Sequence, residues 1–360
     1  MARDQELPSS MNAVVLKRVG EVVVERRPIP SIEDPRDIIV RVQYGGLCGS
    51  DLHPYRGVEY YGSDFIMGHE FTGTVFQTGS AVSKFQVGDV VVSPFTTSCG
   101  SCWYCTHNLS SRCAHTMLYG TPKLGGGQAQ YVRVPYADAT AFRAPENLLP
   151  QNLILMADIF PTGFYAAKNG FAGLSMDEVA ESTVVIIGCG PVGLCAIAAA
   201  ATRKPKHMIA VDGVSSRLEN AKSLGAEPKN FKSDMEGLAQ HIDRITEGRG
   251  ADVVLELVGA KSALQLAYDL ARPGAMISSI GVHNTEFPFT ATQGYDKNLR
   301  LQMGRCPVRT VFGEALQCLN ECQDKLGFLT NTIVPLSDAV EWYKKFNKME
   351  VQKVIFDAAK

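Results

Sequence analysis

"STVVIIGCGPVGLCAIAAAATR", residues 182–203, joins an unbroken apolar run to an alanine-rich run through a short turn. The first run predicts a strand of a parallel sheet covered on both faces, and the second predicts a helix. Gly188, Gly190 and Gly193 stand between them in the pattern G-x-G-x-x-G. Glycines here let the backbone approach a pyrophosphate at the helix N-terminus, where free N–H groups favour anions. The stretch predicts a dinucleotide-binding domain, and a tight strand–helix turn without a ligand is the alternative.

The residues that follow continue the alternation of strand and helix. The apolar runs predict strands at 207–213, 251–259 and 274–282. A Ser cap and a Gly stop predict a helix at 215–226. Asp212 ends the second strand, 19 positions after Gly193. A carboxylate there accepts bonds from both adenosine ribose hydroxyls and repels a 2′-phosphate, which favours NAD over NADP. Arg217 can support a 2′-phosphate, so NADP stays open.

Composition and charge describe a globular protein. The chain has 360 residues, 45% of them apolar and 20% charged, with a formal net charge of −2. This length predicts about two domains, and the charge offers no basic field for nucleic acid or a membrane surface. We find no run of ~20 apolar residues that would span a bilayer. The opening "MARDQELPSSMN" carries no apolar run behind its charges, unlike a secretory signal. We therefore expect a cytoplasmic protein without nucleic-acid or membrane partners.

The first 155 residues have a different sequence pattern. Short alternating runs such as 22–29, 37–44 and 71–79 are separated by turn signals, which predicts a mostly antiparallel, barrel-like β domain. Within it, "CGSCWYCTHNLSSRC" at 99–113 carries cysteines at 99, 102, 105 and 113. In a reducing compartment such a cluster favours a metal over disulfides. Cys99, Cys102, Cys105 and Cys113 would fill a zinc tetrahedron and leave no open position, so the site would be structural. The alternative is a redox dithiol.

A second group of metal-binding residue types lies in "LCGSDLH", residues 47–53, and "GHEFTG", residues 68–73. Cys48 and His69 stand 21 residues apart and are candidate ligands of a catalytic zinc, which takes three protein ligands and keeps one position open. A buried core thiol and a satisfied core histidine are the alternatives. A nicotinamide cofactor implies hydride transfer, which needs such an electrophile near the reacting oxygen.

In combination these motifs resemble the zinc-dependent medium-chain alcohol dehydrogenase family over nearly the whole chain. The resemblance lies in "GGLCGSDLH", "GHEFTGTV", "VGDVVV", the four-cysteine stretch, "TGFYAA" and "GCGPVG", in that order. It implies an α/β protein with a GroES-like β-barrel catalytic domain at 1–159, which includes a structural zinc lobe at 99–113. A Rossmann doubly wound parallel-sheet NAD-binding domain would occupy 160–306, and the chain would return to the catalytic domain at 307–360.

The resemblance also implies roles for single residues. Asp158 in "MADIFPTG" stands where many members have a Cys, and would join Cys48 and His69 on the catalytic zinc. The expected content is two zincs per chain and NAD(H). The carboxylate would make the zinc more Lewis-acidic than a thiolate would. Glu70 would lie beside the metal or approach it when solvent is displaced.

The proton relay and cofactor contacts are implied in the same way. Asp51 would accept the second ring N–H of His69, Ser50 would accept the alcohol proton, and His53 would pass it to solvent. Lys353 would reach the pyrophosphate. The remaining cofactor contacts would come from the glycine turn, including Pro191, and from three residues against the nicotinamide, namely Thr162, Val192 and Val282.

The predicted activity is reversible hydride transfer between a small or medium alcohol and NAD. The alternatives are a polyol (sorbitol-like) dehydrogenase, a glutathione-independent formaldehyde dehydrogenase and a catalytically silent NAD-binding structural protein. Phe160, Tyr55 and Tyr60 would line the substrate pocket. The resemblance implies a homodimer or homotetramer joined through Rossmann strands such as 274–282.

Overall fold

The computed structural model describes residues 8–59 and 61–360 in two compact units. Two parts of the chain lie outside this description. They are residues 1–7, which open the segment compared with a secretory signal, and the predicted pocket residue Tyr60. One unit comprises the described residues up to Asp158 together with Pro307–Phe312 and Gly327–Lys360. The other comprises Ile159–Cys306 and Gly313–Leu326.

The second unit therefore includes a segment, residues 313–326, that we expected in the first unit. Residues 313–326 belong to it, although the chain was predicted to return to the catalytic domain at 307. Side-chain contacts explain the difference. Glu314 forms an ion pair with Lys168, and the Cys318 thiol lies 3.8 Å from the Thr202 hydroxyl. Helix α11 (Val308–Cys322) thus begins in one unit and ends in the other.

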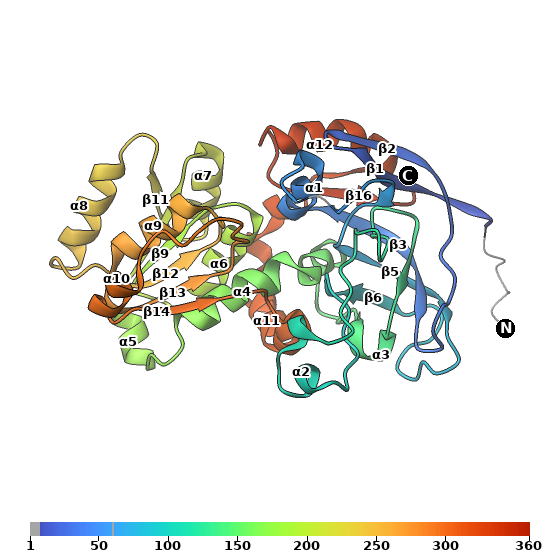
Figure 1. The fold of residues 1–360 in the computed structure, drawn as a ribbon, viewed down its shortest axis with the longest axis horizontal. Helices are drawn as coiled ribbons and strands as arrows, with labels where there is room; N and C mark the ends of the chain where they lie inside the picture. The colour runs from blue at the N-terminus through green and yellow to red at the C-terminus, as the bar shows by residue number, and fades with distance from the viewer. Residues whose placement is uncertain (1–7, 60) are drawn as a thin grey trace. The chain divides into compact units, whose positions relative to one another are not determined.

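The second unit is built on a six-stranded parallel sheet, as the predicted Rossmann fold requires. The strand order is β11-β10-β9-β12-β13-β14, with a reversal between β9 and β12 (Figure 1). In open α/β sheets, ligands bind at such a switch point. The strands are β9 (Thr183–Ile187), β10 (His207–Asp212), β11 (Glu227–Asn230), β12 (Ala251–Glu256), β13 (Ala271–Ser279) and β14 (Arg300–Met303).

Strand β13 cannot provide the open edge through which we expected subunits to join. It pairs with β12 on one side and with β14 on the other, so its backbone hydrogen bonds are made within the sheet. Residues 300–303 lack the long apolar run of 274–282, so the sixth strand was not predicted. Strand β14 lies at the end of the sheet instead.

Helices cover the sheet of the second unit. Residues of α8 and α9 share one apolar cluster with the strands, whereas α4 and α6 pack against each other. A Cβ on Gly163 of α4 would press against the backbone of α6, so a glycine is required for this close approach. The helices are α4 (Ile159–Gly170), α5 (Met176–Glu181), α6 (Pro191–Ala201), α7 (Ser215–Ser223), α8 (Met235–Ile245), α9 (Lys261–Leu270) and α10 (Ala291–Asp296).

The first unit contains two sheets. One has the order β2-β1-β4, and the larger one has the order β15-β16-β3-β5-β6-β8, with β7 paired to β3. All its pairs are antiparallel except β15–β16, in agreement with the predicted β domain. The strands are β1 (Ser10–Arg18), β2 (Glu21–Pro28), β3 (Ile38–Leu47), β4 (Phe65–Ile66), β5 (Phe71–Thr78), β6 (Val90–Ser93), β7 (Tyr131–Val134), β8 (Phe142–Arg143), β15 (Ile333–Pro335) and β16 (Val354–Asp357).

Short helices complete the first unit. Helix α12 (Ala339–Asn347) packs Tyr343 and Phe346 into a core that also contains Leu52 and Phe356. Figure 1 shows α12 beside β2 and near α1. The other α-helices are α1 (Leu52–Arg56), α2 (Trp103–Thr106) and α3 (Ala137–Thr140), and the 3₁₀ helices of the chain are η1 (Gly49–Asp51), η2 (Ser110–Arg112), η3 (Pro150–Ala157), η4 (Gln323–Lys325), η5 (Gly327–Leu329) and η6 (Leu336–Asp338).

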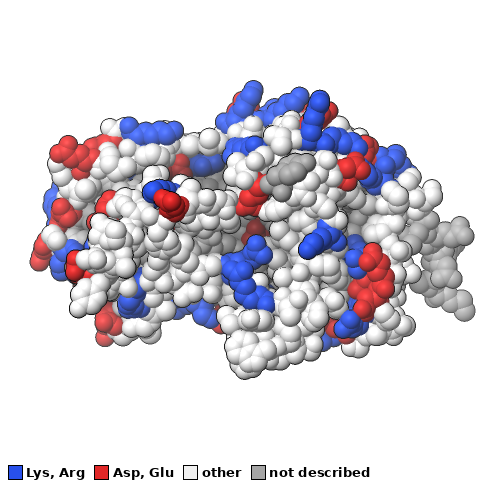
Figure 2. Space-filling view, in the orientation of Figure 1, with Lys and Arg blue, Asp and Glu red and all other residues white. Residues whose placement is uncertain are grey.

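The surface carries both signs of charge. Lys and Arg are interspersed with Asp and Glu over the face drawn in Figure 2, with broad uncharged areas between them. In the part of the chain that the structure describes, none of the helices combines the length and the apolar composition needed to cross a membrane.

The glycine turn after β9 yields a first prediction. A Cβ on Gly193 would overlap the carbonyl oxygen of Gly188, whereas a Cβ on Gly190 would meet nothing within 4 Å. Gly193→Ala should lower the free energy of unfolding by about 2 kcal/mol, because the backbone of the turn must shift. Gly190→Ala, the matched control, should change it by less than about 1 kcal/mol. Thermal unfolding without added cofactor measures both, and equal midpoints would contradict the close packing of this turn.

Candidate active site

Four buried side chains of the first unit converge at the ends of two neighbouring strands. One donor atom from each of Cys48, His69, Glu70 and Asp158 lies within 4.8 Å of all the others. Cys48 follows β3 directly, and His69 and Glu70 precede β5. These strands pair antiparallel with Gly45 opposite Phe71, so the end of one lies beside the start of the other.

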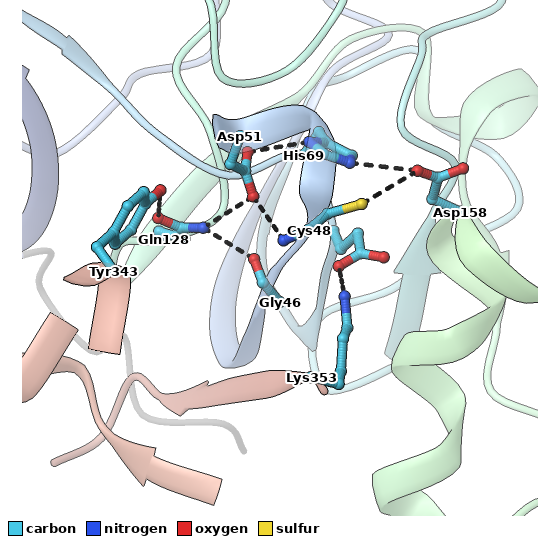
Figure 3. Close-up of polar contacts among 9 residues, drawn as sticks. Gly46, Cys48, Asp51, His69, Gln128, Asp158, Tyr343 and Lys353 are labelled. Atoms are coloured by element: carbon cyan, nitrogen blue, oxygen red, sulfur yellow. Dashed lines mark hydrogen bonds and ion pairs between the residues drawn. The ribbon is translucent and has the colours of Figure 1, made fainter. Parts of the chain in front are cut away.

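Asp158 reaches the same point from a distant part of the chain. It follows η3, whose last residue, Ala157, accepts a backbone hydrogen bond from Phe95 at 3.0 Å. Its Oδ2 lies 3.2 Å from His69 Nε2 and 4.0 Å from Cys48 Sγ (Figure 3). The structure thus brings together the three residues that the sequence motifs suggested as ligands of one metal.

The chemistry of this donor set fits a divalent cation. Burial raises the pKa of the Cys48 thiol and of the Glu70 carboxyl, because it removes the water that would solvate their charges. Glu70 Oε1 is buried and has no hydrogen-bond partner among the described residues. A thiolate, an imidazole and carboxylate oxygens are ligands that zinc accepts. A cation at this point would stabilise the ionised groups and satisfy the free oxygen.

Asp51 connects two of these donors. Its Oδ1 lies 3.1 Å from His69 Nδ1, which is the partner we expected for the second ring nitrogen. Its Oδ2 accepts the backbone N–H of Cys48 at 2.9 Å. Burial alone would lower the pKa of His69, but the carboxylates of Asp51 and Asp158 outweigh it and raise that pKa well above its ordinary value.

Ser50 and His53 lie on the accessible side of this segment. Ser50 is exposed in η1, and His53 in α1 is partly exposed. His53 Nδ1 lies 3.4 Å from a carboxylate oxygen of Glu59. Both side chains are therefore placed where protons can be exchanged with solvent.

Lys353 does not occupy the position that the resemblance implied. We expected it to reach a cofactor pyrophosphate, but its side chain is only 1% exposed and its ammonium forms an ion pair with Glu70 Oε2. Burial alone would lower the pKa of Lys353, but Glu70 outweighs this effect and raises it. The ammonium compensates a buried carboxylate in the metal-binding cluster, which the sequence could not indicate because 283 positions separate the two residues.

The four cysteines at 99–113 also converge, with sulfur atoms within 4.8 Å of one another. Backbone N–H groups point at the sulfurs: Cys102 donates to Cys99 and Cys99 donates to Cys113, both at 3.3 Å. Partial burial opposes ionisation of Cys99, but hydrogen bonds from the backbone of Ser101 and Cys102 outweigh it and lower its pKa to about 6. Gly100 has φ +77°, which suits glycine in this tight turn. Partial burial instead raises the pKa of Cys105 to about 12 and also raises that of Cys113. A cation among the four sulfurs would favour the thiolate form of all of them.

The glycine turn after β9 has the predicted strand–helix context. Gly188 has φ +95°, Gly190 caps α6, and Pro191 is the first residue of that helix. Val192 is partly exposed beside it. Free N–H groups at this helix start can receive an anionic group.

Asp212 at the end of β10 supports this turn directly. Its Oδ2 accepts the backbone N–H of Cys189, and its Oδ1 accepts that of Val214, both at 2.8 Å. Arg217 Nη1 lies 3.9 Å from Oδ2. The carboxylate is therefore held at the predicted position, and the nearest guanidinium pairs with it.

A buried polar group that was not predicted lies at the ends of β12 and β13. Glu256 is fully buried and accepts the backbone N–H groups of Val258 and Gly259 at 2.8 Å. It also accepts the Ser279 hydroxyl at 2.7 Å, and His283 Nε2 lies 3.0 Å from it. A carboxylate inside the apolar run "ADVVLELVG" was the available signal, since a buried charge needs partners.

The other predicted contact residues lie in varied surroundings. Val282 is 53% exposed, close to this buried group in sequence, whereas Thr162 is buried in α4. Phe160 is fully buried in α4. Tyr55 differs from the expectation of a pocket wall, because it packs into the core with its ring centroid 5.5 Å from that of Tyr343.

Comparisons with known proteins agree with these features. Residues 34–146 match the family model "Alcohol dehydrogenase GroES-like domain", and residues 191–321 match "Zinc-binding dehydrogenase". Zinc-type alcohol dehydrogenase B of Aspergillus flavus is 56% identical over 350 residues, which cover 97% of this chain and 82% of the relative. Medium chain reductase/dehydrogenase ucsI of an Acremonium species is 51% identical over 290 residues, 80% of this chain and 99% of the relative. The solved structure of alcohol dehydrogenase TADH from Thermus sp. ATN1 aligns with a TM-score of 0.88 and 34% identity, and covers 96% of this chain and 99% of its own.

The buried ion pair yields the second prediction. Lys353→Met leaves the Glu70 carboxylate without its cation, which should lower the free energy of unfolding by about 3 kcal/mol in metal-depleted protein. Adding Glu70→Gln should recover most of the loss, because the uncompensated charge is gone. Lys345→Met, which removes an exposed lysine paired with Glu341, is the control and should cost less than about 1 kcal/mol. Urea unfolding measures all three, and equal losses for the two lysines would contradict this account.

Proposed function

Since the chain belongs to the zinc-dependent medium-chain alcohol dehydrogenase family and is a zinc-dependent alcohol oxidoreductase, we propose that it transfers hydride reversibly between a small or medium alcohol and NAD. The observation that carries the proposal is the convergence of Cys48, His69 and Asp158 in one buried cluster. A catalytically silent relative would have no reason to keep all three donors.

We propose two zincs per chain. Cys48, His69 and Asp158 would hold the catalytic ion, and Cys99, Cys102, Cys105 and Cys113 the structural one. When bound, the catalytic zinc supplies a Lewis acid for the alcohol oxygen, and NAD supplies the hydride acceptor. Four thiolates close the second site, so it would stabilise its lobe only.

The residues of the chain would fix the ligands and move the proton. Asp51 would keep Nδ1 of His69 protonated, so that Nε2 faces the metal. Ser50 would accept the alcohol proton, and His53 would pass it to solvent, which its partial exposure permits. Glu70 would remain paired with Lys353 and offer its free Oε1 to the same cluster.

For the cofactor we propose NAD rather than NADP. Gly188, Gly190 and Gly193 would let the backbone of the turn approach the pyrophosphate. The Asp212 carboxylate would repel a 2′-phosphate, and Arg217 is drawn toward Asp212 instead of standing free for such a group. Val192, Thr162 and Val282 stay candidates for nicotinamide contacts.

A polyol is the second candidate substrate class. The free oxygen of Glu70 beside Cys48 and His69 offers a carboxylate donor from a different motif than Asp158, as polyol-type relatives use. Of the two substrate classes we favour a primary or secondary alcohol, because Asp158 itself contacts His69 in the cluster. A panel of alcohols, polyols and aldehydes, assayed for NADH absorbance, separates these classes.

We also propose a cytoplasmic homodimer or homotetramer. None of the ten cysteines, all of which lie in the described residues, forms a disulfide, and this fits a reducing compartment. The outer edge of β14 offers unpaired backbone groups on which a second copy can extend the sheet.

Removal of the carboxylate ligand tests the catalytic site. Asp158→Ala should lower kcat/KM at least about a hundredfold and reduce the zinc content from two to one per chain, because the site loses its third donor. Asp138→Asn, an acidic residue that binds Ser83 and Lys84 elsewhere in the same unit, is the control and should keep both values. Elemental analysis and NADH absorbance give the answer, and full activity in Asp158→Ala would remove Asp158 from the site.

Removal of a thiolate tests the structural site. Cys105→Ser should lose one zinc per chain and lower the thermal midpoint, because the lobe loses its closed coordination. Cys306→Ser, which alters a buried thiol outside both clusters, should keep two zincs. If Cys105→Ser retained its full zinc content, the four cysteines would not form the second site.

A further inference from the structure

We infer that Gln128 and Tyr343 are positioning residues of the metal centre, which act through Asp51 on two metal ligands at once. The inference rests on the proposed function in that it takes Cys48 and His69 as ligands. It concerns a chain of buried hydrogen bonds that runs from α12 to the imidazole of His69 (Figure 3).

Asp51 is the point at which this chain meets the ligands. One of its carboxylate oxygens faces His69 Nδ1, and the other accepts the backbone N–H of Cys48. Because one carboxylate contacts both His69 and the backbone of Cys48, rotation of Asp51 would displace these two ligand residues together. The orientation of this carboxylate therefore sets the geometry of two donors.

Gln128 fixes that orientation. Its Nε2 donates to Asp51 Oδ2 at 3.2 Å and to the carbonyl oxygen of Gly46 at 2.8 Å. Its backbone is held on both sides, since its N–H donates to Met67 at 3.0 Å and its carbonyl accepts from Val14 at 2.8 Å. A fully buried amide on a fixed backbone offers Asp51 a donor in one direction only.

Tyr343 holds the other end of the Gln128 amide. Its hydroxyl donates to Gln128 Oε1 at 2.7 Å from the interior of α12. Burial raises the pKa of Tyr343 well above its ordinary value, so the hydroxyl keeps its proton. Without this donor the buried Oε1 would lose its hydrogen bond, and the amide would be held only by the bonds from Nε2 to Asp51 and Gly46. The tyrosine thus orients the glutamine, which orients the aspartate.

A purely structural role predicts a different result from a positioning role. Tyr343 also packs its ring against Tyr55 and Phe356, so its loss could destabilise the core without affecting the metal. Tyr343→Phe keeps the ring and removes only the hydroxyl. Tyr119→Phe removes an equally buried hydroxyl, which lies 3.2 Å from Ser93 and outside the chain of hydrogen bonds, and is the matched control.

The experiment measures metal affinity rather than activity alone. The catalytic site is loaded with Zn²⁺ or Co²⁺ in competition with a chelator, in wild type, Tyr343→Phe, Gln128→Met, the double variant and Tyr119→Phe. Tyr343→Phe and Gln128→Met should each weaken binding about tenfold, the range typical of residues that orient a metal-bound histidine, and should shift the Co²⁺ absorption bands. The double variant should bind no more weakly than Gln128→Met, because both changes break one chain. Tyr119→Phe should match wild type.

Wild-type affinity and absorption bands in Tyr343→Phe would overturn the inference, even if its thermal midpoint fell. Additive losses in the double variant would also overturn it, since the two residues would then act separately. If Tyr343→Phe did not fold, Gln128→Met alone would decide, by losing or keeping its metal affinity. Failure of the proposed function looks different: Asp158→Ala would then bind Co²⁺ as tightly as wild type.

Discussion

Several ionisable side chains are buried together in the first unit, and this is the constraint on which the rest of that unit depends. Cys48, Glu70 and Asp158 would each carry negative charge if ionised, and burial penalises every one of those charges. Among the described residues, Lys353 supplies a positive charge that pairs with Glu70. A divalent metal would supply the remaining positive charge, so binding of the metal and stability of this region are coupled.

Both cysteine-containing sites bring metal-binding atoms together, but one is local in the sequence and the other is assembled from distant segments. The lobe at 99–113 draws all four sulfurs from fifteen neighbouring residues, and its own backbone N–H groups point at them. The site around His69 is assembled from β3, β5 and η3, and hydrogen bonds to Asp51 hold it in place. A local site survives small changes elsewhere, whereas an assembled site depends on every strand that carries a ligand. The residues that support the assembled site therefore extend as far as α12.

Spacing in the sequence indicates groups that are formed by neighbouring residues. The glycine turn, Asp212 and the four cysteines could be located from spacing because a turn or a strand end determines their geometry. It failed for Lys353, whose amino group was assigned to a cofactor phosphate but is paired with Glu70. It failed for Tyr55 as well, because an aromatic residue near a ligand motif can point into the core instead. Side-chain direction depends on packing, which spacing does not report.

The sequence by itself determined the alternation of strand and helix after residue 182, the two kinds of domain, the family resemblance and the candidate metal ligands, since periodicity and turn residues act over a few positions. Only the tertiary structure decided that α11 ends in the second unit, that β13 is an interior strand and that Gln128 and Tyr343 reach Asp51. The physical reason is that hydrogen bonds and ion pairs between residues far apart in the chain form only after the strands have paired, and no local pattern records them.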